Sequence, residues 1–318
     1  MKNLNNKYKI GFLDIIRCFN STVALHRTAL NEKFITGFTD AEGCFYIRIT
    51  KKNSMKIGWT VEPIFSIRLH TKDLAILELI QAFFHTGKIY VSKDIKEAVF
   101  RVSSMKELEI IISHFDKYPL VTQKWSDFML FKQVFDLMKC KKHLTLDGLQ
   151  DIVNIKASMN TEISLSAFPS TVPVIRPSVP LNNLIDPFWF SGFVTGDGCF
   201  SVSLKKSKSH KLGETVWLRF IVTQHIHDKD LINSFVNYFG CGKINYDSQA
   251  VYYVVQKLSD LTDIIIPFFD KYPIEGVKVK DLEDFKKVAK LMKSNAHLTK
   301  EGLEEIRKIV SGMNTLRK

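Results

Sequence analysis

One phrase of this chain occurs twice, and it constrains the fold more than any other feature. Residues 34–45, FITGFTDAEGCF, return as residues 189–200, WFSGFVTGDGCF. Each copy is an apolar run of helical character that ends in an acid and a glycine and then continues as a strand. Two acids in two matching places predict a site built by pseudo-twofold symmetry.

The repeat extends over most of the chain. Residues 84–89 match residues 239–244, and residues 115–119 match residues 269–273, at almost the same separation as the first phrase. Chance matches would scatter, so the constant separation indicates a duplicated domain that is far longer than a solenoid repeat. One chain then imitates a C2 dimer, in which both halves present the same face to a shared axis.

The chain is strongly basic, with a formal net charge of +12 and a sequence pI near 9.3. This balance points to a polyanionic partner, nucleic acid before a membrane surface. No apolar run approaches the length of a membrane span. The five cysteines are odd in number and form no C-x-x-C pair, which favours a reducing compartment over a zinc site or a disulfide framework.

The repeat divides the chain into four segments. We expect an N-terminal arm at residues 1–30, a first repeat at 31–160, a linker at 161–187 and a second repeat at 188–318. Five of the nine prolines fall in the linker, where they cannot continue a helix or join a central strand. The basic arm fits either a transit peptide or a loosely ordered extension.

Alternating apolar and polar residues after each phrase predict strands. In the first copy Phe45, Ile47 and Ile49 share one face, and the second copy repeats the pattern. Helices near residues 74–84 and 231–239 precede a second hairpin in each copy. The resulting order, αββαββα, predicts an α+β fold in which each repeat has an antiparallel four-stranded sheet with helices on one face.

The opposite face of each predicted sheet is polar and basic. Basic residues recur at equivalent places in both copies, which favours a binding surface over a plain solvated face. An exposed two-stranded ribbon of this kind can read the DNA major groove. The residues expected on this face are Cys44, Tyr46, Arg48, Thr50, Lys52, Ser66 and Arg68 in the first copy, and Cys199, Ser201, Ser203, Lys205, Arg219, Ile221 and Thr223 in the second.

Small residues four apart mark one face of each predicted motif helix. They are Gly37 and Ala41 in the first copy, and Gly192 and Gly196 in the second. Positions i and i+4 share a helix face, and small side chains let two backbones approach closely, so we expect the two helices to touch there. The glycines that follow, Gly43 and Gly198, are expected in the left-handed conformation that ends many helices.

Glu42 and Asp197 should therefore lie at the adjacent C-terminal ends of two touching helices. A helix C-terminus already carries partial negative charge, and the two acids repel each other. Divalent metal would compensate, and carboxylates that hold such ions form the clamp used in phosphodiester hydrolysis. The alternative, that both acids only cap helices, is weak because that position favours cations. Asp40 has Thr195 as its counterpart, so we expect it to be structural.

The two phrases resemble the motif of the LAGLIDADG homing endonucleases, in their single-chain form with two repeats. The matched positions are Gly37, Asp40, Ala41 and Gly43 in residues 35–43, and Gly192, Gly196, Asp197 and Gly198 in residues 190–198. The order of elements is similar to that of the fungal mitochondrial branch, and the resemblance covers nearly everything from residue 31 on. Two motif copies in a duplicated chain are much more specific than one motif.

This resemblance implies a site-specific double-strand DNA endonuclease of intron homing, a mitochondrial protein that acts as a monomer on a long asymmetric target. It implies that Glu42 and Asp197 bind two or more Mg²⁺ ions and position the attacking water, helped by the carbonyls of Ala41 and Gly196. Mn²⁺ would substitute for Mg²⁺, and Ca²⁺ would support binding without cleavage.

The family also tends to place a basic residue near each scissile phosphate, and the best matches are Lys124 and Lys278. A polar residue on the second strand often orders active-site water in the family. Gln224 fits this position, whereas its counterpart in the first copy is Leu69. The resemblance therefore implies unequal half-sites and unequal rates for the two strand cuts.

Two other functions use the same scaffold: an intron RNA maturase that holds RNA on the basic sheets, and a DNA-binding regulator that does not cleave. Both intact acids favour cleavage, although an enzyme that also assists splicing stays open. Elsewhere, His70 and His225 occupy equivalent positions and are expected to form hydrogen bonds rather than bind metal. The acidic clusters are expected on solvated helix faces, and they comprise Asp281, Glu283 and Asp284, and Glu301, Glu304 and Glu305.

Overall fold

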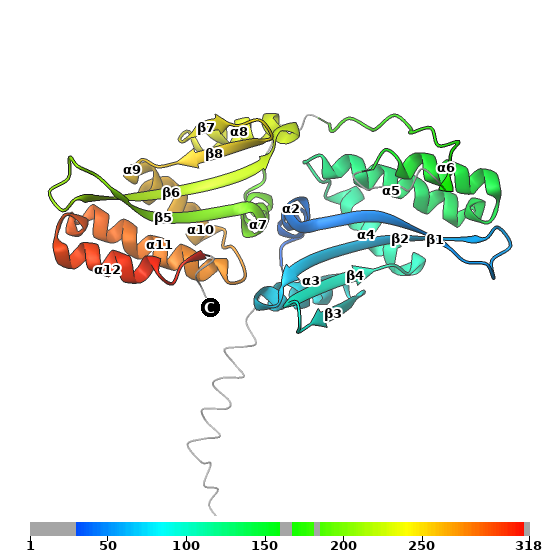
Figure 1. The fold of residues 1–318 in the computed structure, drawn as a ribbon, viewed down its shortest axis with the longest axis horizontal. Helices are drawn as coiled ribbons and strands as arrows, with labels where there is room; N and C mark the ends of the chain where they lie inside the picture. The colour runs from blue at the N-terminus through cyan, green and yellow to red at the C-terminus, as the bar shows by residue number, and fades with distance from the viewer. Residues whose placement is uncertain (1–29, 160–166, 181–184, 315–318) are drawn as a thin grey trace, which may run out of the picture. The chain divides into compact units, whose positions relative to one another are not determined.

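The computed structural model describes residues 30–159, 167–180 and 185–314. The chain divides into a unit of residues 1–30 and a unit of residues 31–318. The fold of the second unit is shown in Figure 1. Apart from Leu30, the expected N-terminal arm lies outside the described residues.

The first repeat contains helices and strands in the expected order. Its elements are α2 (Glu32–Glu42), β1 (Gly43–Lys51), β2 (Trp59–His70), α3 (Leu74–Phe84), β3 (Lys88–Ser92), β4 (Glu97–Val102), α4 (Met105–Lys117), α5 (Lys124–Lys139) and α6 (Leu146–Lys156). A short 3₁₀ turn, Thr71–Asp73, joins β2 to α3.

The second repeat has the same order. Its elements are α7 (Pro187–Asp197), β5 (Gly198–Lys206), β6 (Glu214–His225), α8 (Lys229–Phe239), β7 (Lys243–Tyr246), β8 (Ala250–Val255), α9 (Leu258–Asp260), α10 (Ile266–Lys271), α11 (Lys278–Lys293) and α12 (Lys300–Val310). A 3₁₀ turn, Ile226–Asp228, follows β6. The counterpart of α4 is divided into α9, a π-helical stretch and α10. Pro267, which has no N–H to donate, is the second residue of α10, directly after the π-helical stretch.

Each repeat forms a four-stranded antiparallel sheet, with strand orders β1-β2-β4-β3 and β5-β6-β8-β7. The α+β prediction is confirmed. Phenylalanines fill the space between sheet and helices: the ring centroid of Phe45 lies 4.9 Å from that of Phe65 and 5.5 Å from that of Phe115. In the second repeat the centroids of Phe200 and Phe220 are 5.3 Å apart. These inward residues leave the other face of each sheet to polar side chains.

Each motif helix begins at a side-chain cap. Asn31 Oδ1 accepts a hydrogen bond from the Lys33 amide over 2.8 Å, and the Asp186 side chain accepts from two amides at the start of α7. Pro187 is the first residue of α7, a position that suits proline because its missing N–H would have no partner inside the helix. The helix therefore begins at the last residue of the expected linker.

Gly43 and Gly198 do not adopt the left-handed conformation expected from the sequence. Their φ and ψ angles are −74° and 152°, and −84° and 153°, so both are extended. Glycine is required there for space: a Cβ on Gly43 would lie 2.4 Å from Thr39 Cγ2, and one on Gly198 would lie 2.4 Å from Val194 Cγ1. Each motif helix thus passes directly into a strand.

The expectation for one acidic cluster is wrong at Asp281, which is only 6% exposed. Its Oδ1 accepts a hydrogen bond from the Asn314 amide over 2.9 Å, because this position of α11 faces the protein and not the solvent. The other acids of the two clusters are exposed or partly exposed, and they are Glu283, Asp284, Glu301, Glu304 and Glu305.

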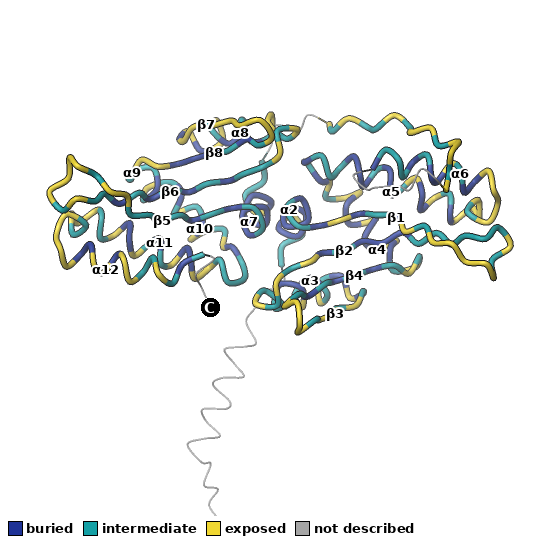
Figure 2. The backbone as a smooth tube through the Cα atoms, in the orientation of Figure 1, coloured by how far each residue is buried: buried dark blue, intermediate teal, exposed yellow. Residues whose placement is uncertain are grey.

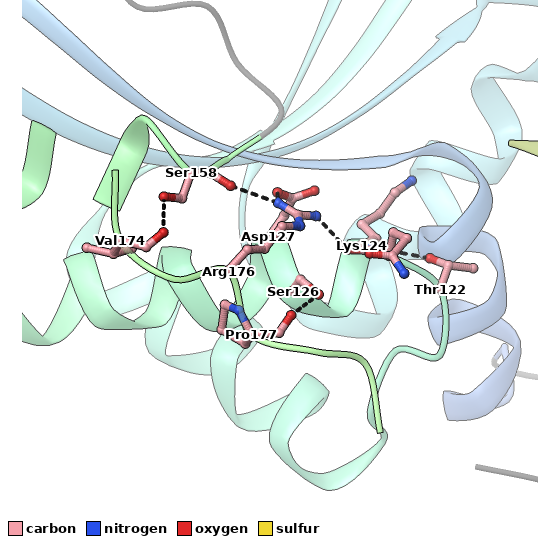
Figure 3. Close-up of polar contacts among 9 residues, drawn as sticks. Thr122, Lys124, Ser126, Asp127, Ser158, Val174, Arg176 and Pro177 are labelled. Carbon is pink, nitrogen blue, oxygen red and sulfur yellow. Dashed lines mark hydrogen bonds and ion pairs between the residues drawn. The ribbon is translucent and has the colours of Figure 1, made fainter. Parts of the chain in front are cut away.

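The described part of the linker lies against the first repeat (Figure 3). Arg176 Nη1 donates to Asp127 Oδ1 over 2.6 Å, and Arg176 Nη2 donates to the Gln123 carbonyl over 3.0 Å. Ser126 Oγ donates to the Pro177 carbonyl over 2.7 Å. These bonds tie the linker to the N-terminal turn of α5. No helix among the described residues is long and apolar enough to cross a membrane.

Candidate active site

The two motif helices, α2 and α7, pack against each other with their backbones in contact. A Cβ on Gly37 would lie 1.9 Å from the Trp189 carbonyl oxygen, and one on Gly192 would lie 2.0 Å from the Phe34 carbonyl oxygen. A Cβ added to Gly196 would lie 2.4 Å from the Cβ of Ala41. Figure 2 shows both helices as buried over most of their length. The small residues predicted at this interface therefore occupy positions where larger side chains have no room.

The last residues of these helices are Glu42 and Asp197. The two acids are close neighbours. Gly196 directly precedes Asp197, and a Cβ added to Gly196 would lie 3.3 Å from Glu42 Oε1. Burial raises the pKa of Glu42 above its usual range, while Lys124 and Lys278 oppose the shift. Burial, and then repulsion from Glu42, raises the pKa of Asp197 to about 6. Such an arrangement of two acids attracts a cation.

Two partly buried lysines lie at the same helix ends. Lys124 Nζ donates to the carbonyl of Ala41 over 3.0 Å, and Lys278 Nζ donates to the carbonyl of Gly196 over 2.6 Å. Each also donates to a carbonyl two residues earlier in the same helix, at 3.0 Å. Burial lowers the pKa of both lysines, while the nearby acids oppose the shift. The ammonium groups thus offset the partial negative charge of the helix ends.

The carbonyls of Ala41 and Gly196, which the family resemblance assigns to metal, accept hydrogen bonds from the lysines. A carbonyl oxygen has two lone pairs, so each can accept from lysine and still face a cation. The described residues contain no group of three or more His, Cys, Asp and Glu side chains that could hold a metal. An ion beside Glu42 and Asp197 would complete its shell from carbonyls, water or phosphate, as Mg²⁺ commonly does.

The site is not symmetric at the second strand. Gln224 Nε2 donates to Asp197 Oδ2, so this amide contacts one of the paired acids. Its counterpart Leu69 has no polar group to offer Glu42. An open cavity of about 560 Å³ borders Asp197 and Gln224, and also Lys124. The cavity gives a ligand room beside Asp197.

The sheet face of the first repeat carries a charged network. Glu62 Oε1 accepts from Arg101 Nη2 over 2.7 Å, and Glu62 Oε2 lies 3.3 Å from Arg48 Nη1. Arg68 Nη1 is 2.9 Å from both carboxylate oxygens of Glu97. The residues expected on this face are all exposed or partly exposed. Six of them lie on β1 and β2, and the seventh lies in the turn after β1: Cys44, Tyr46, Arg48, Thr50, Ser66, Arg68 and Lys52.

The second sheet has an aromatic residue where the first has Glu62. Lys205 Nζ lies 3.9 Å from the ring centroid of Trp217, and the Arg219 guanidinium carbon lies 5.8 Å from it. Ser203 Oγ and Arg219 Nε are buried without a hydrogen-bond partner among the described residues. The residues expected here are all partly or fully exposed, namely Cys199, Ser201, Ser203, Lys205, Arg219, Ile221 and Thr223.

The sequence reasoning missed Glu62, Arg101 and Trp217 on the sheet faces. It also missed Asp73 and Asp228, which occupy equivalent positions in the two repeats and contact the loops before Lys278 and Lys124. The recurrence of an acid at the same separation as the motif phrases was the available signal. The last residues of β2 and β6, His70 and His225, have the hydrogen-bonding role expected of them, because Nδ1 of each accepts from a backbone amide two residues on.

Comparison with known proteins relates this geometry to a family. The model of the LAGLIDADG endonuclease family matches residues 35–135 and 190–289. A probable intron-encoded endonuclease 3 of Neurospora crassa is 40% identical over 91% of this chain, and a probable intron-encoded endonuclease 2 of the same fungus is 39% identical over 93%. The chain spans 54% and 70% of the lengths of these two relatives.

A solved structure of similar fold has been described as I-SmaMI bound to uncleaved DNA target in the presence of calcium ions. It is 45% identical, with a TM-score of 0.86, over 90% of this chain and 99% of that one. The two family matches cover most of each motif helix, both sheets, Lys124 and Lys278. The chain belongs to the LAGLIDADG endonuclease family.

Proposed function

We propose that this chain is a site-specific endonuclease that hydrolyses one phosphodiester bond in each strand of a DNA duplex. The observation that carries the proposal is the meeting of Glu42 and Asp197 at the touching ends of α2 and α7. A regulator or an RNA maturase that only binds nucleic acid has no need of two partly buried acids paired between the repeats. The names of the two Neurospora crassa relatives support the same activity.

Glu42 and Asp197 would hold two or more Mg²⁺ ions, and Mn²⁺ would substitute. When bound, such ions stabilise charge on a phosphate and lower the pKa of water. The carboxylates supply the negative charge that holds the ions, and Gln224 fixes the orientation of Asp197 through its hydrogen bond. Lys124 and Lys278 place positive charge at the helix ends, where the scissile phosphates would approach.

The DNA would lie across the polar faces of both sheets. Each repeat would cover roughly one turn of DNA, about 10 bp, and the chain would act as a monomer because it carries both halves of the site. The description of I-SmaMI as bound to a DNA target supports this mode of binding. Light scattering of the complex should give one protein chain per duplex, and two chains would contradict the proposal.

The same proposal includes that this chain is encoded by an intron and belongs to a mitochondrion. It is supported by the two relatives named as probable intron-encoded endonucleases and by the resemblance of the repeat to the fungal mitochondrial branch. Intron RNA is then a further possible partner, which the basic sheet faces could bind through phosphate contacts.

The test is selection of cleaved sequences from a randomised duplex pool with Mg²⁺. We expect one long asymmetric sequence to be recovered, and we expect none with EDTA. Glu42→Gln and Asp197→Asn should abolish cleavage while retaining binding in Ca²⁺, because each removes a carboxylate and preserves volume. Near-normal cleavage by either variant would contradict the assignment of the acids. Sequence-specific binding without cleavage by the unaltered protein would contradict the nuclease and favour the regulator.

A further inference from the structure

An acid at an equivalent place in each repeat accepts a hydrogen bond from the backbone of the other repeat. Asp73 ends the 3₁₀ turn after β2, and Asp228 ends the equivalent turn after β6. Asp73 Oδ1 accepts a hydrogen bond from the Val277 amide over 2.8 Å, and Asp228 Oδ1 accepts from the Gln123 amide over 2.8 Å. The two bonds are therefore reciprocal, with the acid of each repeat bonded to the backbone of the other.

The two amides stand at functionally sensitive positions. Gln123 and Val277 are the N-caps of α5 and α11, and the next residues are Lys124 and Lys278. The first amides of a helix have no acceptor within the helix, and an acid there is favoured by the positive end of the helix dipole. Each acid thus fixes the start of the helix that carries Lys124 or Lys278.

We propose that Asp73 and Asp228 are positioning residues, each of which holds the loop that delivers the lysine of the other repeat to the acid pair. The effect on catalysis rests on the proposed nuclease function. The reciprocal hydrogen bonds between the repeats do not depend on it. Each lysine donates hydrogen bonds, at 2.6 to 3.0 Å, to carbonyls of the motif helix in its own repeat. A small displacement of either loop would break these short contacts and misplace the ammonium group.

Burial and packing agree with a positioning role. Burial raises the pKa of Asp228 to about 6, while the hydrogen bond from Gln123 opposes the shift. On the other side, Gly276 has a φ of +75°, and a Cβ there would lie 2.5 Å from Asp73 Oδ1 and 2.6 Å from Ile76 Cδ1. The turn after β2 is therefore pressed against the loop of the second repeat.

The two loops are not held equally. In the first repeat Asp40 accepts from the amides of Val121 and Thr122 at 3.0 and 3.1 Å, and Arg176 of the linker donates to the Gln123 carbonyl. In the second repeat Thr195 stands in place of Asp40, and its hydroxyl accepts from the Glu275 amide at 3.3 Å. We therefore expect the loop before Lys278 to depend more on Asp73 than the loop before Lys124 depends on Asp228.

Hydrogen–deuterium exchange of the free protein, without any DNA, tests whether the two acids fix the loops of the opposite repeats. Asp228→Ala should speed exchange in peptides spanning residues 120–126 by about tenfold and leave residues 274–280 unchanged, whereas Asp73→Ala should do the reverse. Asp73→Asn and Asp228→Asn keep an acceptor oxygen and should remain near the unaltered protein. The proposal would be overturned if either alanine variant left exchange unchanged in the loop of the other repeat, or if it accelerated exchange equally in both loops.

Strand-specific cleavage tests the consequence for the lysines. On a linear duplex carrying the selected target, with each strand end-labelled, Asp228→Ala should slow one strand cut and Asp73→Ala the other, each by about tenfold or more. The ratio of the two rates is independent of the folded fraction, so poor folding cannot imitate this result. Slowing of the same strand by both variants, or of both strands equally, would overturn the positioning role. Absence of cleavage by the unaltered protein would instead contradict the proposed function, and the exchange experiment would still decide the hold.

Discussion

The indole of Trp189 donates a hydrogen bond from Nε1 to Oδ2 of Asp40 over 2.8 Å. The two residues belong to different motif helices, so this bond joins the repeats directly. Asp40 Oδ1 also accepts from Thr122 Oγ1 over 2.6 Å. Burial raises the pKa of Asp40, while the bonds from Thr122 and Trp189 oppose the shift. Asp40 thus joins its own helix, the loop before α5 and the second repeat.

Replacement of Trp189 by phenylalanine should lower the free energy of unfolding by about 1–3 kcal/mol, because a buried acceptor loses a donor. Chemical denaturation measures this change. Trp217→Phe is the matched control, since Trp217 is partly exposed on a sheet face and should change stability little. Equal destabilisation by the two substitutions would show that the bond to Asp40 does not help to join the repeats.

Asp197→Asn should stabilise the metal-free protein even though it removes an acid assigned to cleavage. Burial and the neighbouring Glu42 disfavour the charged carboxylate, and asparagine keeps the volume without the charge. We expect a gain of about 2 kcal/mol in the free energy of unfolding at pH 7 in EDTA. Mg²⁺ should then stabilise the unaltered protein and not the variant. A less stable Asp197→Asn protein would show that the acid pair is not repulsive.

His114 should make stability fall on acidification. Burial lowers its pKa from 6.5 to about 4, so between these values the unfolded chain binds a proton that the folded protein does not. The contribution is complete above pH 6.5 and is lost as the pH falls towards 4, by about 3 kcal/mol in total. Phe268 occupies the equivalent position in the second repeat, so His114→Phe should remove this slope. Parallel pH profiles for the two proteins from pH 7 to 4.5 would refute the assignment.

Arg48 should specify base pairs in the half-site of the first repeat. Glu62 lies between Arg48 and Arg101 and limits the directions in which the two guanidinium groups can point. Arg48→Ala should relax preference at one or two neighbouring base pairs, at a cost of about 1–3 kcal/mol if the contact is bidentate to guanine. Selection on a pool randomised within one half-site measures this change. Ser203, the counterpart of Arg48, gives the control variant Ser203→Ala. A uniform loss over all sequences would indicate that Arg48 contacts only phosphate.

The period-two alternation and the repeated phrase predicted the sheets, their polar faces and the contact of the motif helices, because these depend on local pattern and on symmetry. The other contacts between the repeats could not be predicted in the same way. The hydrogen bonds from Gln123 to Asp228 and from Val277 to Asp73 depend on how the two folded halves dock. The buried position of Asp281 likewise depends on where the end of the chain packs.

The close contact of α2 and α7 makes a sharp prediction about Gly192. Even an alanine Cβ would lie 2.0 Å from the Phe34 carbonyl oxygen and 2.9 Å from the Phe38 amide nitrogen. Both atoms belong to helix backbone, so no side-chain rotation relieves the clash and the two helices must separate. Overpacking typically costs about 1–3 kcal/mol, and backbone contact should place Gly192→Ala at the upper end.

Separation of the helices would also move Glu42 away from Asp197 and weaken the proposed metal site. We therefore expect Gly192→Ala to lower both the melting temperature and the rate of Mg²⁺-dependent cleavage, although glycine takes no part in the chemistry. Gly312→Ala is the control, because its added Cβ would meet the Ile309 oxygen at an ordinary 3.7 Å. A Gly192→Ala protein with the melting temperature and activity of this control would show that the helices do not touch there, and the argument for a shared site between Glu42 and Asp197 would fail with it.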